Sequence, residues 1–132
     1  MVLAAAAAAA LVTAAGAPAW ELMGQSGPVK IVYIEPAALK DLKRVAPVVA
    51  EIMARFGRER PVQIDFFDDR RTAPKALPYT REQRLRQKAK FNFNPRTGRE
   101  RFVRIEPAAD PNAPDVVRLR EVEESLPPPP PP

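Results

Sequence analysis

Both ends of the chain are of low complexity, which confines a folded unit to the sequence between them. Residues 4–10 are seven consecutive alanines, and residues 127–132 are six consecutive prolines. The apolar patterning that predicts helices and strands runs from Val29 to Glu106, a stretch of 78 residues. A domain of this size buries only ~60–65% of the surface of its unfolded chain, so we expect one small domain of marginal stability.

The first half of this stretch predicts a strand, a helix and a second strand. Val29–Glu35 is almost continuously apolar, as in a strand covered on both faces, and Val62–Phe67 follows Pro61 as a second strand. Pro47 lies on the polar side of the helix between them, so we expect one kinked helix, or two helices broken there. The apolar residues at helical spacing are Leu39, Leu42, Val45, Val49, Ile52 and Phe56. This order predicts a parallel pair of strands with a right-handed crossover.

The second half predicts a β-hairpin over Lys88–Glu106. Two runs of strand-forming residues flank an Asn-Pro-Arg-Thr-Gly turn, where Pro95 suits the first position and Gly98 can adopt a positive φ. Thr80 and Gln83 form a capping box that predicts a short helix before the hairpin. The predicted fold class is α+β: a small mixed sheet, β-α-β-(short α)-β-β, with one long amphipathic helix on one face. The short helix, the C-terminal tail or another subunit could cover the other face.

The flanking segments indicate an exported protein. Residues 1–19 form an uncharged apolar run that ends in Ala17-Pro18-Ala19, a cleavage motif that makes them a predicted signal peptide and leaves Trp20 as the new N-terminus. No Lys or Arg precedes the run, so an upstream start or an untranslocated leader in a cytoplasmic protein is the alternative. Residues 20–28 are interpreted as a linker, and residues 107–132 as a Pro-rich acidic tail that is largely disordered. The predicted location is periplasmic or secreted, with no transmembrane segment in the mature chain.

An exported strand–helix–strand–hairpin chain with an Asn-Pro-x-Thr-Gly turn resembles small bacterial periplasmic domains of unknown function. The resemblance covers about Val29–Glu106 and rests on the pattern and the turn. It implies a fold and a compartment and carries over no functional residue.

Missing residue types limit the possible chemistry. The chain has no Cys and no His, which excludes Ser–His and Cys–His nucleophiles and zinc sites built on thiolate or imidazole. We therefore expect a protein that is not an enzyme and needs no cofactor. The enzymatic alternative is a hydrolase that uses Mg²⁺ or Ca²⁺ held by carboxylates that end the two parallel strands, namely Glu35, Asp68 and Asp69. Ion pairs with the adjacent Arg70 and Arg71 explain these acids equally well.

Basic residues are concentrated in one part of the chain. Residues 70–104 contain twelve Lys and Arg against two Glu, a net charge of +10 that attracts anions. The anion-binding residues predicted on the hairpin are Lys88, Lys90, Arg99, Arg101 and Arg104. The hairpin also carries Phe91, Phe93 and Phe102, which either stack on nucleic-acid bases or form the core. The acidic tail could fold back and mask the basic hairpin, or simply keep the chain soluble.

These observations give one leading hypothesis for the function and two alternatives. In the first, the chain is a binding or accessory module that presents its basic hairpin to an anionic glycan, lipid or protein surface in the cell envelope. The second is a cytoplasmic protein that binds single-stranded nucleic acid, and the third is the carboxylate-dependent hydrolase. The sequence leaves the oligomeric state open.

Overall fold

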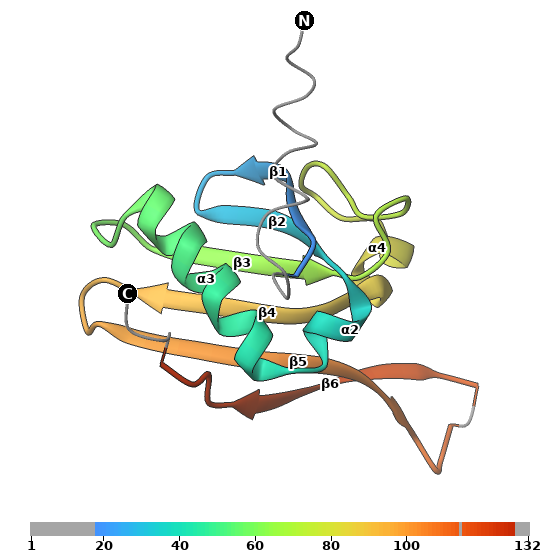
Figure 1. Cartoon of the computed structure of the whole chain (residues 1–132). Helices are drawn as coiled ribbons and strands as arrows, with labels where there is room; N and C mark the ends of the chain where they lie inside the picture. Colours follow the sequence, from blue (N-terminus) through green and yellow to red (C-terminus); the bar gives the residue numbers. More distant parts are fainter. Residues whose placement is uncertain (1–17, 114, 129–132) are drawn as a thin grey trace, which may run out of the picture.

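The computed structural model describes residues 18–113 and 115–128, which form one six-stranded sheet with associated helices (Figure 1). The strands are β1 (Trp20–Ser26), β2 (Val29–Ile34), β3 (Val62–Phe67), β4 (Gln87–Asn94), β5 (Arg99–Ala109) and β6 (Val117–Glu124). The helices are α2 (Pro36–Leu39), α3 (Leu42–Phe56) and α4 (Arg81–Arg86). The α+β class and the small mixed sheet are thus confirmed.

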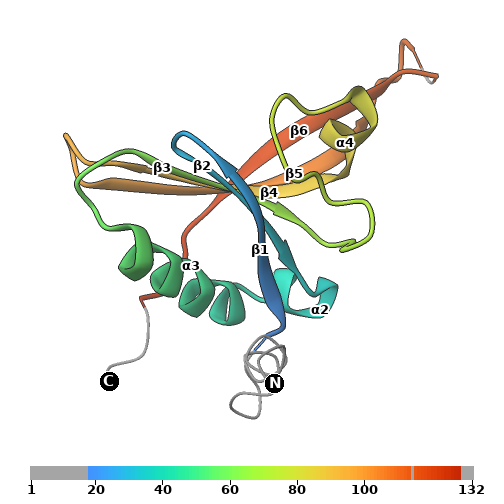
Figure 2. The ribbon, with the colours of Figure 1, turned by 90° about the horizontal axis from the view of Figure 1, so that it is seen from above.

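The strands lie side by side in the order in which they occur in the chain. All neighbouring pairs are antiparallel except β2 and β3, which are parallel and are joined through α2 and α3. Figure 2 shows α2 and α3 on one side of the twisted sheet, and α4 with the loop before it on the other side. We call these sides the helix face and the open face.

Helix α3 packs its apolar residues on the sheet and is capped at both ends. The Asp41 side chain accepts a hydrogen bond from the Lys43 amide at 3.0 Å, and Gly57, with φ of 82°, follows the last residue. The helix continues through Pro47; the chain breaks instead at Asp41, whose backbone is extended, so that Leu39 belongs to the separate helix α2. The residues of α3 that are buried are Val45, Ala46, Val48, Val49, Ile52 and Met53.

The larger core lies between α3 and the sheet. Phe91 and Phe102 are directly opposite each other on β4 and β5, and Phe102 meets Phe66 edge to face with ring centroids 6.2 Å apart. Together with Phe93, the hairpin phenylalanines are at most 5% exposed. They are therefore core residues, and the interpretation of these rings as a stacking platform for bases is wrong.

Loop 68–80 covers the open face over β1 to β3. A smaller core forms beneath it from Val29, Ile31, Phe67 and Ala73, with Tyr79 packed against it. The loop approaches β1 so closely that a Cβ atom on Gly24 would lie 2.0 Å from the Lys75 carbonyl oxygen. Within the described chain, the loop covers this part of the sheet. The sequence had suggested the short helix, the tail or another subunit for this role.

Two segments that were assigned to the flanks are edge strands of the sheet. Residues 20–26, interpreted as a linker, form β1, whose Trp20 and Leu22 pack on the larger core. Residues 117–124, interpreted as part of a disordered tail, form β6 beside β5, and Leu126 then packs on the larger core. Both strands supply backbone hydrogen bonds to a neighbour, a contribution that side-chain patterns alone do not reveal.

The predicted signal peptide lies outside the described residues, apart from Pro18 and Ala19. No helix in the described part of the chain is long and apolar enough to cross a bilayer.

Candidate anion-binding site

The hairpin end of the open face carries a polar surface built by strand alternation. Phe91 and Phe93 point to the helix face. The residues of β4 that alternate with them therefore point to the open face. Asn92 lies opposite Arg101, and Asn94 lies opposite Arg99 on β5. Loop 68–80 and α4 lie over the other end of these strands, away from the hairpin turn (Figure 2).

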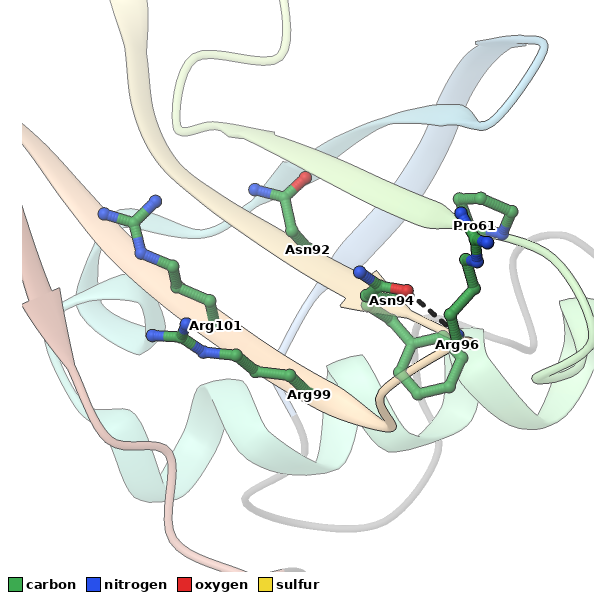
Figure 3. A pocket seen from close by; sticks show the side chains of 7 residues that line it. Pro61, Asn92, Asn94, Arg96, Arg99 and Arg101 are labelled. Carbon is green, nitrogen blue, oxygen red and sulfur yellow. Dashed lines mark hydrogen bonds between the residues drawn. The ribbon is translucent and has the colours of Figure 1, made fainter.

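This surface is hollowed at the turn. An open hollow of about 480 Å³ is lined by Pro61, Asn92, Phe93, Asn94, Arg96, Arg99 and Arg101. Figure 3 shows Arg99 and Arg101 extending from β5 on one side, Arg96 beside Pro61 on the other, and Asn92 between them. Three guanidinium groups and two carboxamides therefore border one hollow.

The turn fixes the position of Arg96. The Asn94 carbonyl accepts a hydrogen bond from the Gly98 amide at 2.8 Å, and the Asn94 side-chain Oδ1 accepts one from the Arg96 amide at 2.9 Å. Gly98 has φ of 73°, a conformation that residues with a Cβ rarely adopt. The turn chemistry that predicts the hairpin thus also supplies one basic side chain of the hollow.

Strand β6 brings acidic residues beside these arginines. Arg101 Nε donates to Glu123 Oε1 at 2.8 Å, and Arg99 Nη2 lies 3.9 Å from Glu123 Oε2. Lys90 Nζ donates to Glu121 Oε2 at 3.1 Å. The hydrogen bond that Arg101 donates to Glu123 raises the pKa of Arg101, and the same bond lowers the pKa of Glu123. The acidic segment therefore lies beside the hairpin and partly neutralises it, as one of the two interpretations of the acidic tail expected.

The structure brings together most of the basic residues predicted on the hairpin. Lys90, Arg99 and Arg101 share the open face, and Lys88 is half-buried further along β4. Arg104 does not belong to this surface, because its side chain lies on the helix face. There Arg104 Nη1 donates to the Leu39 carbonyl at 2.6 Å and Nε pairs with Glu124.

Sequence reasoning missed three polar residues of the hollow, Asn92, Asn94 and Arg96, besides Pro61 and Phe93. The signal for the asparagines was available, because they alternate with two phenylalanines and so had to face the side opposite to the core. Arg96 gave no comparable signal, since the direction of a turn side chain depends on the turn conformation.

The carboxylates proposed as a metal site do not assemble. Glu35 pairs with Arg44, and the Asp69 carboxylate accepts a hydrogen bond from the Arg71 amide at 3.0 Å within the loop. Among the residues that the structure describes, no group of three His, Cys, Asp or Glu could hold a metal ion. Glu35, Asp68 and Asp69 are therefore not gathered into the predicted site. Arg70 also reaches elsewhere, to Glu21 on β1 at 2.8 Å.

A buried carboxylate that the sequence did not single out as a site residue ties loop 68–80 to the sheet. Asp65 on β3 is 2% exposed and accepts hydrogen bonds from the Tyr79 hydroxyl at 2.5 Å and from Gln63 Nε2 at 2.9 Å. Burial, together with the hydrogen bond to Asp65, raises the pKa of Tyr79 well above its ordinary value. Both carboxylate oxygens have partners, so the group serves the structure of the loop.

Comparison with known proteins gives no relative from which a function could be transferred. No family model, curated protein or solved structure matches the chain.

Proposed function

We propose that this chain is an exported, non-enzymatic binding module whose hairpin binds an anionic partner in the cell envelope. The observation that carries the proposal is the hollow at the turn, which is lined by Arg99 and Arg101 on one side and by Arg96 on the other. Guanidinium groups bind carboxylate, sulfate and phosphate through paired N–H donors, and they remain charged at any physiological pH.

The charge balance of the open face favours an anion even after the internal ion pairs are counted. From β3 to β6 this face carries five cations, Lys88, Lys90, Arg96, Arg99 and Arg101, and three carboxylates, Asp65, Glu121 and Glu123. Five cations against three carboxylates leave a balance of +2. The Arg99 side chain is 69% exposed and Glu123 holds it only at 3.9 Å, so an incoming anion can compete for it.

The place where β1 begins supports the proposal of export. Cleavage after Ala19 would leave Trp20, the first residue of β1, at the new N-terminus, so the edge strand would stay complete. The fold would lose one hydrogen bond there, from the Glu35 amide to the Ala19 carbonyl at 3.0 Å.

The two alternative functions have less support. A single-strand nucleic-acid binder needs exposed aromatic rings for stacking, and Phe91, Phe93 and Phe102 lie in the core. The hydrolase needs a group of carboxylates, which the described residues do not form.

The proposal is tested by neutralising the hollow without disturbing the fold. The double variant Arg99→Gln/Arg101→Gln should weaken binding to a soluble polyanion such as heparin about tenfold or more in low salt, measured by titration calorimetry, because two direct contacts are removed. The matched control is Arg118→Gln/Arg120→Gln on β6, which changes the net charge equally but lies outside the hollow.

An equal loss of affinity in both double variants would show that net charge alone drives binding and would overturn the assignment of the hollow. Binding that does not weaken as salt rises would also contradict the proposal, because exposed ion pairs are screened.

A further inference from the structure

The hollow combines two kinds of hydrogen-bonding groups, and the combination restricts the ligand. Guanidinium groups only donate hydrogen bonds, whereas a carboxamide both donates and accepts them. Within the described residues no side-chain hydrogen bond involves the Asn92 carboxamide, whereas the Asn94 Oδ1 accepts a hydrogen bond from the turn. A phosphate or sulfate group offers acceptors only and has no use for the Asn92 carbonyl. A ligand with hydroxyl groups beside its anion would use both.

The internal partner of the arginines shows which anion fits them. The two oxygens of the Glu123 carboxylate face different arginines, Oε1 toward Arg101 at 2.8 Å and Oε2 toward Arg99 at 3.9 Å. A planar carboxylate thus already occupies the space between these two side chains on the β6 side. Each guanidinium group has five N–H donors, so donors remain for a second carboxylate that enters from the hollow.

The arrangement repeats along the strands. The pair of Asn94 and Arg99 is followed two residues further along by the pair of Asn92 and Arg101, a step of about 6.8 Å in an antiparallel sheet. A chain-like ligand that lies along the strands would therefore meet a guanidinium group and a carboxamide at two successive positions, although the Asn94 Oδ1 is engaged by the turn. The hollow is open to one side of the surface and, at about 480 Å³, falls in the size range of small-ligand sites.

From these three observations we infer that the anionic partner of the hollow is an acidic polysaccharide built of uronate units. The carboxylate of one unit pairs with Arg99 and Arg101 opposite Arg96, and the sugar hydroxyls hydrogen-bond the Asn92 carboxamide. This inference rests on the proposed anion-binding function and adds the chemical class of the ligand.

The test compares three polymers on the purified protein at one fixed ionic strength, by titration calorimetry: polygalacturonate, polyphosphate and neutral dextran. We expect polygalacturonate to bind and dextran to give no signal. Asn92→Ala should weaken binding of polygalacturonate about five- to tenfold, the size of one or two hydrogen bonds, and leave binding of polyphosphate unchanged. Asn112→Ala, an exposed asparagine in the turn before β6, is the matched control.

A second variant tests the inference even if Asn92→Ala fails to fold. Glu123→Gln removes the internal carboxylate and should strengthen binding of polygalacturonate; a weaker affinity would contradict the inference. If polyphosphate binds more tightly than polygalacturonate and Asn92→Ala affects neither, the uronate assignment is overturned while the anion-binding function stands. If none of the polymers binds, or dextran binds as well as the acidic polymers, the proposed function fails with it.

Discussion

At the scale of single residues, buried polar groups and surface charges have different roles. Asp65 is buried with both oxygens hydrogen-bonded, which is the condition under which a buried carboxylate is tolerated. The arginines of the hollow stay accessible, and their internal ion pairs are exposed and therefore weak. Among the polar groups, the Asp65–Tyr79 contact thus stabilises the fold, while accessible charge lies at the hairpin turn.

Tyr79→Phe should lower the free energy of unfolding by about 1.5–3 kcal/mol, because a hydrogen bond to a buried charged group is lost. The pKa of Tyr79 is raised above its ordinary value of 10.0. Its contribution is therefore fully present below about pH 10 and decreases as the pH rises beyond that value. Urea denaturation at neutral and alkaline pH measures both effects.

Tyr33→Phe is the matched control for this experiment. Tyr33 is a half-buried tyrosine of β2 that points to the open face, the same face on which Tyr79 packs. The wild-type protein should lose more stability than Y79F on going to alkaline pH. Equal losses for Y79F and Y33F at neutral pH would show that the hydrogen bond to Asp65 contributes nothing specific.

At the scale of elements, the sequence predicts what apolar side chains specify. The buried strands β2 and β3, the hairpin and the capping box before α4 all follow from apolar runs, alternation and turn residues. The edge strands do not follow, because their apolar residues do not form a clear strand pattern. In β6, ion pairs such as those from Glu121 and Glu123 replace apolar contacts, and β1 contains Gly24 next to an irregularity in its pairing.

The candidate site was also predictable only in part. Lys90, Arg99 and Arg101 were found from charge, but their neutralisation by β6 required knowledge that the tail is a strand. Arg104 was assigned to the wrong surface, although its separation of three positions from Arg101 places the two on opposite faces of any regular strand. Charge counting along the sequence therefore located the surface, and strand alternation was needed to define it.

Gly24→Ala should destabilise the fold by about 1–3 kcal/mol, because the new Cβ atom would overlap the Lys75 carbonyl oxygen and push loop 68–80 off the sheet. Limited trypsin digestion provides the structural measurement, since Arg70, Arg71 and Lys75 all lie in this loop. Cleavage there should become faster than in the wild-type protein. Ser26→Ala, an exposed change in the same strand, should leave the rate unaltered; faster cleavage in both variants would contradict the close-packing argument.

At the scale of the whole molecule, the chain enters and leaves the described fold on the helix face. Trp20 at the start of β1 and Leu126 after β6 both pack on the larger core between α3 and the sheet. The hollow lies on the other face, to which Asn92, Arg99 and Arg101 point. Segments that precede or follow the described fold would therefore leave the proposed binding surface uncovered at these two points.

Export predicts a defined product. The intact mass of the protein recovered from the envelope fraction of its native host should correspond to a chain that begins at Trp20. A cytoplasmic marker protein, followed in the same fractions, is the control for separation. A full-length chain found in the cytoplasm would overturn the proposed location, and polyanions of the cytoplasm would then be the first ligands to test.

The order of the strands has a consequence for how the protein folds. Since every strand pairs with the strand before or after it in the chain, most pairings close only a short connection and lose little loop entropy. The two longer connections are residues 68–86 between β3 and β4, which include α4, and residues 35–61 between the parallel strands β2 and β3, which include both α2 and α3. We expect the folding barrier to lie in assembling β2, α3 and β3 as a nucleus, with the outer strands adding to it afterwards in both directions.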